Sequence, residues 1–164
     1  EIELARKLHN EKDVIKFLTD PTIITKKKQV EWFKNLQKSE KSFRLVVYNN
    51  KKQFIGVFRL DDFDQNNKSA SVGLDIVKEN RGKKYSTKIY NCLIEYLFSL
   101  SINRLSLETL ENNYVAINLY EKLGFVQEGI FREAIFREKK YLNLIKFSLI
   151  KSDYNKKWKK YLKK

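Results

Sequence analysis

Hydrophobic and polar residues alternate along three successive segments in the first half of the chain. The segments are SFRLVVYN (42–49), QFIGVFRLDDF (53–63) and KSASVGLDIV (68–77). A period of two places successive side chains on opposite faces of a strand, so each segment is predicted to be a β-strand. The clusters between them, Asn49-Asn50 and Asp64-Gln65-Asn66-Asn67, predict turns short enough for hairpins.

Apolar residues recur three or four positions apart in two segments before these strands. The first group is Val14, Phe17 and Leu18, and the second is Val30, Phe33 and Leu36. This spacing indicates two amphipathic helices. Asp20-Pro21 is predicted to end the first helix, and Thr25 is predicted to cap the second.

Helical and strand-like segments alternate in the second half of the chain. A helix is predicted from about Tyr85, with an apolar face formed by Tyr85, Ile89, Cys92, Leu93, Tyr96, Leu97 and Leu100. The strand RLSLETL (104–110) follows, then a helix over 113–123 that Gly124 ends, and strands from Phe125 and over 141–150. The order predicts an α/β fold with a mixed, mostly antiparallel sheet and helices on both faces.

The segment LDIVKENRGKKYSTKIY (74–90) changes from a strand into a short loop and then into a helix. Backbone N–H groups at the start of a helix have no partner within it, and the helix dipole favours negative charge there. Arg81, Lys83 and Lys84 add positive side chains at this point. The sequence therefore predicts a site for an anion such as a pyrophosphate.

Composition and charge indicate one domain over residues 1–150, followed by a Lys-rich tail or linker start over residues 151–164. The 164 residues are 42% hydrophobic and carry a net charge of +14, which favours anionic partners. The tail contains seven lysines and one aspartate. Its apolar residues recur at helical spacing and predict a basic terminal helix: Tyr154, Trp158, Tyr161 and Leu162.

The single cysteine and the single histidine exclude several kinds of chemistry. Cys92 cannot form an internal disulfide and is expected to be buried on its helix, which fits a reducing cytoplasm. His9 has no Cys or carboxylate at ligand spacing, so neither a metal site nor a Ser–His–Asp triad is expected. No apolar run approaches the roughly 20 residues that span a bilayer.

Two motifs in the second half of the chain carry a family resemblance. Arg81-Gly82-Lys83-Lys84-Tyr85-Ser86 follows the order Arg or Gln, two residues, Gly, one residue, Gly or Ala, except that Lys84 and Ser86 replace two small residues. ENNYVAINLYEKLGF (111–125) is very close to Asn-x-x-Ala…Tyr-Glu-Lys-x-Gly-Phe. At this separation the motifs resemble those of the GNAT superfamily of N-acetyltransferases. The resemblance covers nearly the whole chain and implies the GNAT fold, with a strand–helix–strand core that binds acetyl-CoA.

The resemblance also implies that acetyl passes from acetyl-CoA to a primary amine by direct attack. Main-chain groups around Leu74, Asp75 and Ile76 would pair with the pantetheine arm as an added strand, and an N–H of that strand would polarise the thioester carbonyl. Asn113 is expected to contact CoA, to cap its helix, or to do both. The pyrophosphate would be held by the loop formed by Arg81, Gly82, Lys83, Lys84, Tyr85, Ser86 and Thr87.

Two residues are the candidates for proton transfer. The resemblance places Tyr120 beside the CoA sulfur as the general acid that protonates the departing thiolate. Glu108, twelve residues before Tyr120, is the candidate general base, on the face of its strand opposite Leu105 and Leu107. Many relatives carry a glutamate where this chain has Ser71, which leaves Asp61, Asp62 or a water chain as the alternatives to Glu108.

The acceptor amine is inferred from resemblance and charge. The segments 27–36, 54–76 and 129–150 resemble the ribosomal-protein-acetylase-like branch, especially members that acetylate nucleotide-linked amino-deoxy sugars. A nucleotide-sugar carries two phosphates that a protein of charge +14 would attract, whereas polyamines favour acidic pockets. The sequence therefore favours an anionic nucleotide-sugar, with Arg59, Arg132 and Arg137 as diphosphate contacts and Asp62 as a further acceptor contact.

Several alternatives stay open. A protein or peptide N-terminus, or a polyamine, is the second choice of acceptor. A different class of function is a weakened acetyltransferase scaffold that binds nucleic acid through its Lys-rich tail, although no zinc-finger or aromatic RNA-binding signature is present and nucleic acid is not the expected partner. Whether the protein forms a homodimer, and whether the chain is one domain of a longer polypeptide, is also open.

Overall fold

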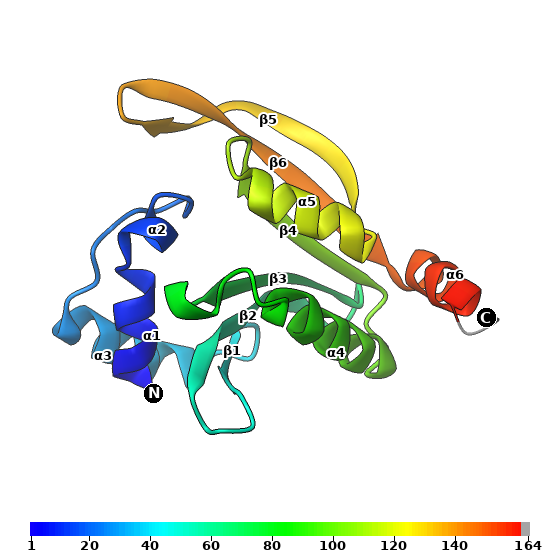
Figure 1. Cartoon of the computed structure of the whole chain (residues 1–164), viewed down its shortest axis with the longest axis horizontal. Coiled ribbons are helices and arrows are strands. Elements are labelled where there is room, and N and C mark those ends of the chain that lie inside the picture. Colours follow the sequence, from blue (N-terminus) through cyan, green and yellow to red (C-terminus); the bar gives the residue numbers. More distant parts are fainter. Residues whose placement is uncertain (162–164) are drawn as a thin grey trace.

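The computed structural model describes residues 1–161, with side chains through residue 156. Within this part of the chain, six strands form one sheet in the order β1-β2-β3-β4-β6-β5 (Figure 1). Their bounds are Phe43–Tyr48 (β1), Phe54–Asp64 (β2), Ser69–Ile76 (β3), Arg104–Leu110 (β4), Val126–Arg137 (β5) and Lys140–Ile150 (β6). Each neighbouring pair is antiparallel except β3 and β4, which run parallel. The predicted mixed, mostly antiparallel sheet is confirmed.

Helices cover both faces of this sheet, as predicted. Their bounds are Ile2–His9 (α1), Lys12–Ile15 (α2), Lys26–Leu36 (α3), Tyr85–Ser99 (α4), Tyr114–Leu123 (α5) and Lys151–Tyr161 (α6), with a 3₁₀ turn at Lys78–Asn80. Adjacent residues of β2 point to opposite faces. Phe58 packs in the main core with Ile94 of α4, whereas Val57 packs with Leu8 of α1 and Val14 of α2.

Local signals at three helix ends agree with the sequence prediction. The Thr25 side chain accepts a hydrogen bond from the Lys28 N–H and caps α3. The Asn113 side chain caps α5 by accepting from the Ala116 N–H. Gly124 ends α5 in the left-handed conformation, with φ of 97°, which costs glycine little.

The first predicted helix is wrong in its extent. The structure has a helix at Ile2–His9, to which the sequence assigned no element, and α2 ends at Ile15, before Phe17 and Leu18. The carbonyls of Leu18 and Thr19 accept hydrogen bonds from Arg137, which lies more than 100 residues away in β5. The backbone after α2 instead forms i→i+3 turns, in which the Phe17 N–H donates to the Val14 carbonyl and the Leu18 N–H donates to the Ile15 carbonyl.

The predicted apolar faces of two helices are also partly wrong. In α3, Gln29 is buried and Val30 is 49% exposed. Positions 29, 33 and 36 lie on one face of a helix, and positions 30, 33 and 36 do so equally well. The spacing therefore fits burial of either residue. In α4, Cys92 is exposed rather than buried. The buried residues of α4 are Tyr90, Ile94, Leu97 and Phe98. This helix carries apolar residues on more than one side, so spacing alone does not identify the side that faces the core.

The pairing of β3 with β4 opens the sheet at one end. The two strands are paired only over three positions, from Ser69↔Arg104 to Ser71↔Ser106. Beyond them, β3 continues to Ile76 on β2, and β4 continues to Leu110 on β6. The strands therefore diverge, and the backbone edge of β3 from Val72 onward has no strand neighbour on the β4 side.

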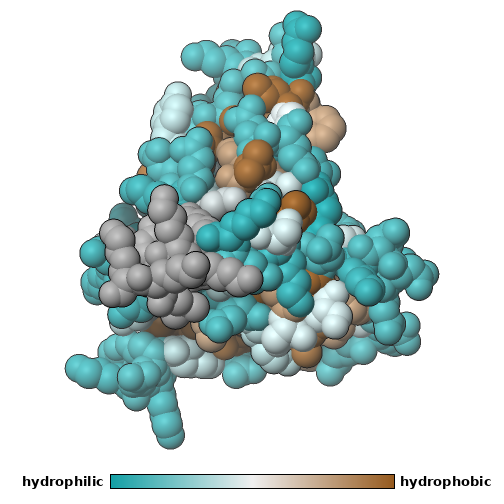
Figure 2. Space-filling view, turned by 90° about the vertical axis from the view of Figure 1, so that its right-hand side faces the viewer, coloured by the Kyte–Doolittle hydropathy of each residue, from teal (hydrophilic) through white to brown (hydrophobic). Residues whose placement is uncertain are grey.

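The C-terminal segment begins as a helix attached to the core. Tyr154 of α6 is buried, and its ring lies 5.2 Å from that of Phe98 in α4. Leu162 lies outside the described residues, as do the side chains of Trp158 and Tyr161. Figure 2 shows a mainly hydrophilic surface in which hydrophobic side chains emerge in the upper part, where the β5–β6 hairpin lies. Among the described residues, no helix is both long and apolar enough to cross a bilayer.

Candidate active site

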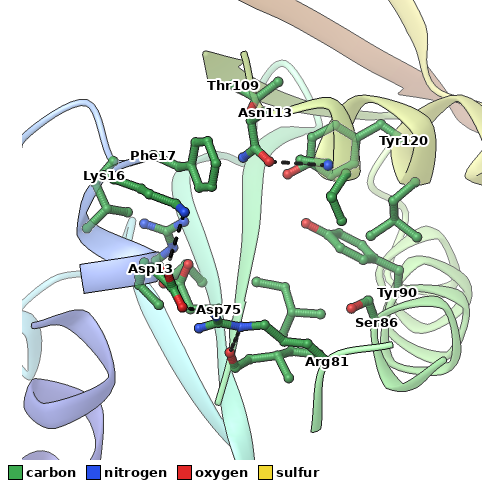
Figure 3. A pocket seen from close by; sticks show the side chains of 18 of the residues that line it. Asp13, Lys16, Phe17, Asp75, Arg81, Ser86, Tyr90, Thr109, Asn113 and Tyr120 are labelled. Atoms are coloured by element: carbon green, nitrogen blue, oxygen red, sulfur yellow. Dashed lines mark hydrogen bonds and ion pairs between the residues drawn. The ribbon is translucent and has the colours of Figure 1, made fainter. Parts of the chain in front are cut away.

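A cavity of about 430 Å³ occupies the fork between β3 and β4. Leu74, Asp75 and Ile76 of β3 line one side, and Glu108 and Thr109 of β4 line the other. The remaining walls come from α4, from α5 and from the segment that includes α2 (Figure 3). The fork thus brings together the residues predicted from β3, the loop before α4, β4 and α5.

The loop before α4 presents backbone to this cavity. Gly82 lines the cavity with φ of +74°, and a Cβ placed on it would meet nothing within 4 Å. Lys84, the residue before α4, also has a positive φ, of 61°, and its side chain does not cap the helix. The N–H groups of the first helical turn are therefore left without a side-chain cap. An open glycine next to these donors fits the approach of a pyrophosphate.

The side chain of Arg81 lies across the floor of the cavity and is tied to other parts of the chain. Its Nε donates to the Ile76 carbonyl at 2.9 Å, and its Nη2 lies 2.9 Å from Glu11 Oε2. Nη1 lies 3.5 Å from Asp13 Oδ2 in α2 (Figure 3). Arg81 thus links the loop before α4 to the N-terminal segment. The other predicted loop residues include Ser86, which also lines the cavity, and Lys83, Lys84, Tyr85 and Thr87, which do not.

Tyr120 projects from α5 into the cavity, and Asn113 lies on the cavity wall at the start of the same helix (Figure 3). Burial raises the pKa of Tyr120 above its usual value, while the neighbouring Tyr90 hydroxyl and the positive charge of Arg59 act to lower it. Tyr120 is therefore protonated at neutral pH and able to donate a proton. Asn113 uses its side-chain oxygen for the cap of α5, which leaves its side-chain N–H groups for a ligand.

A second cavity, of about 260 Å³, continues the first. The two share Phe17, Leu18, Arg59, Glu108 and Thr109 in their walls. The second cavity also contains Asp61, Asp62, Ser71 and Lys146. Its three carboxylates outnumber its two cations, although the whole chain is strongly positive. This end of the fork is suited to a cationic ligand.

The carboxylates of the second cavity differ in their partners. Asp61 lies 2.8 Å from Arg44 Nη1, and Glu108 Oε1 lies 3.3 Å from Lys146 Nζ. Asp62 sits at a bulge of β2 with φ of 51°, and no described residue forms an ion pair with it. Of the three carboxylates of the second cavity, Asp62 is the one without an ion pair among the described residues.

The three arginines predicted for a diphosphate do not meet in one place. Arg59 lines both cavities, lies over Gly73, and its Nε is 3.7 Å from Asp75 Oδ2. Arg137 donates to the carbonyls of Leu18 and Thr19. Arg132 is exposed on β5 and lines neither cavity. The structure gives this set no common anion site.

Sequence reasoning missed the wall formed by residues 13–19 and the contribution of Tyr90. Phe17 and Leu18 line both cavities, and the Arg137 contact holds the loop that follows them. The spacing of Phe17 and Leu18 predicts the face of a helix and carries no signal for a place in the cavity wall. Tyr90 is 1% exposed and lines the first cavity. Its helical spacing is that of an ordinary core residue, so sequence alone carried no signal for its position.

Among the described residues, no cluster of three or more His, Cys, Asp or Glu side chains is placed to hold a metal ion. His9 instead lies with its Nε2 3.2 Å from the Thr22 carbonyl.

Comparisons with known proteins agree with this geometry. The family model described as acetyltransferase (GNAT) domain matches residues 2–126. A spermidine N(1)-acetyltransferase from Vibrio cholerae is 28% identical over 112 residues, which cover 68% of this chain and 65% of that relative. A putative ribosomal N-acetyltransferase from Bacillus subtilis is 31% identical over 100 residues, which cover 60% of this chain and 55% of that relative. The matching part of the chain thus spans less than two thirds of either curated relative.

A solved structure shows the same fold over more of the chain. The crystal structure of spermidine N-acetyltransferase from Vibrio cholerae, in complex with CoA and spermine, superposes with a TM-score of 0.88. It covers 94% of this chain and 92% of its own, at 24% sequence identity.

Proposed function

The chain belongs to the GNAT acetyltransferase family, and we propose that it is an acetyl-CoA-dependent N-acetyltransferase whose acceptor is an aliphatic polyamine. The observation that carries this proposal is the cavity in the fork, whose walls contain both Tyr120 of α5 and Glu108 of β4. A proton donor and a proton acceptor thus face one continuous space. That is the requirement for moving an acyl group between a thiol and an amine.

The first cavity is the expected donor site. The open edge of β3 at Leu74–Ile76 can pair with an extended pantetheine arm, and Gly82 with the start of α4 can hold the pyrophosphate. Acetyl-CoA, when bound, supplies the acetyl group as an activated thioester. An N–H of the β3 edge would stabilise the negative charge that develops on the carbonyl oxygen.

The chain's own residues account for the proton transfers. An ammonium group is not nucleophilic, so Glu108, directly or through water, would accept the proton that the acceptor loses before attack. The amine nitrogen then bonds to the acetyl carbon and the carbon–sulfur bond breaks. Tyr120 would donate its proton to the departing sulfur. Asp61, Asp62 and a water chain are the alternatives to Glu108 for the first step.

The acidic second cavity supports a polyamine over the nucleotide-sugar that the sequence favoured. Asp61, Asp62 and Glu108 would attract a flexible cation locally, even though the net charge of the chain is +14. A spermidine acetyltransferase is among the relatives, and neither of the two curated relatives described above is named as an amino-sugar enzyme. The putative ribosomal N-acetyltransferase supports a protein amine as the second candidate.

A competition among acceptors tests the proposal. Release of free CoA thiol is followed with the purified chain, acetyl-CoA and, in separate reactions, spermidine, spermine, a peptide with a free N-terminus or a nucleotide-linked amino sugar. We expect spermidine or spermine to give the highest kcat/KM. A higher value for the peptide or the sugar would refute the polyamine assignment and leave the acetyltransferase assignment in place. No turnover with any amine would refute both.

A charge-removal pair tests the acceptor end separately. Asp62→Asn removes the unpaired carboxylate of the second cavity and should raise the KM for spermidine several-fold without changing the KM for acetyl-CoA. Glu95→Gln removes the same charge from an exposed position of α4 that lines neither cavity. Equal effects of the two variants would show that only the overall charge matters.

A further inference from the structure

The hydroxyl of Tyr90 is buried in the core without a hydrogen-bond partner among the described residues. Its side chain is 1% exposed, and its ring packs edge-on against Phe58, Phe125 and Tyr120, with centroid separations of 5.8, 6.5 and 6.1 Å. A buried hydroxyl with no partner lowers stability, and a phenylalanine would pack in the same way without that cost. The hydroxyl therefore calls for an explanation other than packing.

The Tyr90 hydroxyl lies in the cavity where the acetyl transfer is proposed to occur. Tyr90 and Tyr120 both line the first cavity, and their side chains project into the same part of it from α4 and α5 (Figure 3). We propose that Tyr90 is a positioning residue for Tyr120: its O–H donates to the Tyr120 oxygen as that oxygen gives up its proton. This inference rests on the proposed function, because it assigns Tyr90 a task in the same reaction.

The step balances as follows. The Tyr120 O–H bond breaks, its proton moves to the sulfur released from the acetyl group, and the electron pair stays on the Tyr120 oxygen. Tyr90 keeps its own proton and stabilises the negative oxygen through a hydrogen bond. The second proton, which the nitrogen loses as the amide forms, then returns to the Tyr120 oxygen, and Glu108 releases the first, ammonium proton to solvent. Relative to the neutral amine, the net change is one N–H proton transferred to the thiol, with Tyr90 unaltered.

The acid strengths of the two phenols agree with these roles. Burial raises the pKa of Tyr90 well above its usual value, so Tyr90 remains a donor throughout the working pH range. Burial also raises the pKa of Tyr120, which weakens it as an acid, whereas the neighbouring Tyr90 hydroxyl acts to lower that pKa. The charged groups that act on the Tyr120 hydroxyl are Arg59 of β2 and Asp75 of β3. The walls of the same cavity also contain Asp13, Lys16, Arg81 and Glu108.

Tyr90→Phe tests the inference. We expect kcat to fall about tenfold, a part of the range of general acid catalysis, while the Kd for acetyl-CoA stays unchanged. Because Tyr120 loses the neighbouring hydroxyl that acts to lower its pKa, the fall of activity at high pH should shift to higher pH. The melting temperature should stay equal or rise, since an unpaired hydroxyl is removed. Tyr96→Phe, at a position of the same helix that is 56% exposed, is the matched control and should change none of these quantities.

The outcomes separate three cases. If Tyr90→Phe changes only the melting temperature and leaves kcat and its pH profile intact, the hydroxyl is structural and the inference is overturned. If Tyr90→Phe lowers kcat by the same factor in a Tyr120→Phe background, Tyr90 does not act through Tyr120, which also overturns it. A wild-type chain with no acetyl transfer to any amine refutes the proposed function instead.

Discussion

Lys146 Nζ lies 3.3 Å from Glu108 Oε1, and the two residues are direct cross-strand partners in β6 and β4. Both side chains are more than a third exposed, so this ion pair contributes only about 0–1 kcal/mol. Such a pair separates easily. If Glu108 is the base, as proposed, it would turn from Lys146 to an incoming ammonium group within the second cavity.

Glu108→Gln is expected to lower kcat strongly and to make activity depend more steeply on high pH. Glutamine keeps the size of the side chain but cannot accept the proton, so the amine must arrive already deprotonated. Rates measured from pH 6 to pH 10 test this. Lys146→Gln, which removes the partner and leaves the carboxylate, should keep kcat within a few-fold. An unaltered pH profile for Glu108→Gln would assign the base to Asp61, Asp62 or water.

Tyr120→Phe is expected to lower kcat by about 10²–10⁴-fold with little change in acetyl-CoA affinity. The ring contacts with Phe125 and Phe147 remain, so only the proton donor is lost. Because burial raises the pKa of Tyr120 above its usual value of about 10, the wild type should lose activity through this group only above that pH. Single-turnover rates and acetyl-CoA titration measure the two quantities. Unchanged turnover would leave Tyr120 as a packing residue.

Acetyl-CoA is expected to stabilise the wild-type fold by about 2.7 kcal/mol at a hundredfold excess over its Kd. Gly82→Val should remove most of this gain, because its φ of +74° is strained for valine and its side chain would stand where the pyrophosphate approaches. Gly129→Val also adds a side chain into open space, but in β5 and away from the cavity. Thermal unfolding with and without acetyl-CoA compares the three proteins. Equal shifts in all of them would place the cofactor elsewhere.

Arg137→Gln is expected to raise the KM for the amine, by about tenfold if 1.4 kcal/mol of binding energy is lost. The substitution removes the hydrogen bonds at 2.7 and 2.9 Å that hold the carbonyls of Leu18 and Thr19. Hydrogen exchange in residues 16–20 should become faster. Arg132→Gln, an exposed position on the same strand, is the control. If Arg132→Gln instead raises the KM for a nucleotide-sugar, the diphosphate contact predicted from the sequence is restored.

Local signals in the sequence were sufficient for most of the fold. Thr25, Asn113 and Gly124 mark helix ends through their own backbone and side-chain chemistry, and each does so in the structure. The exposure of Val30 and Cys92 could not be predicted in this way, because it depends on the rotation of each helix about its axis relative to the elements it packs against.

The candidate site also contains residues that the sequence locates and residues whose position depends on tertiary contacts. Gly82 and Tyr120 belong to continuous motifs, and Glu108 is proposed from its strand face and its position twelve residues before Tyr120. The fork brings all three to one cavity. Phe17 and Leu18 reach that cavity through a contact with Arg137, more than 100 residues away. No spacing within one segment carries that information.

The short pairing of β3 with β4 has a consequence for how the protein behaves in a crowded solution. An unpaired strand edge on a protein surface is a template for aggregation. Here the edge opens inside the fold, between walls contributed by α4 and α5, so a molecule must enter the cavity to reach it. If β3 and β4 were paired beyond Ser71, this edge would be closed and the cavity would be lost. The fork thus shields unpaired backbone groups of β3 from neighbouring chains and leaves them accessible to an extended ligand.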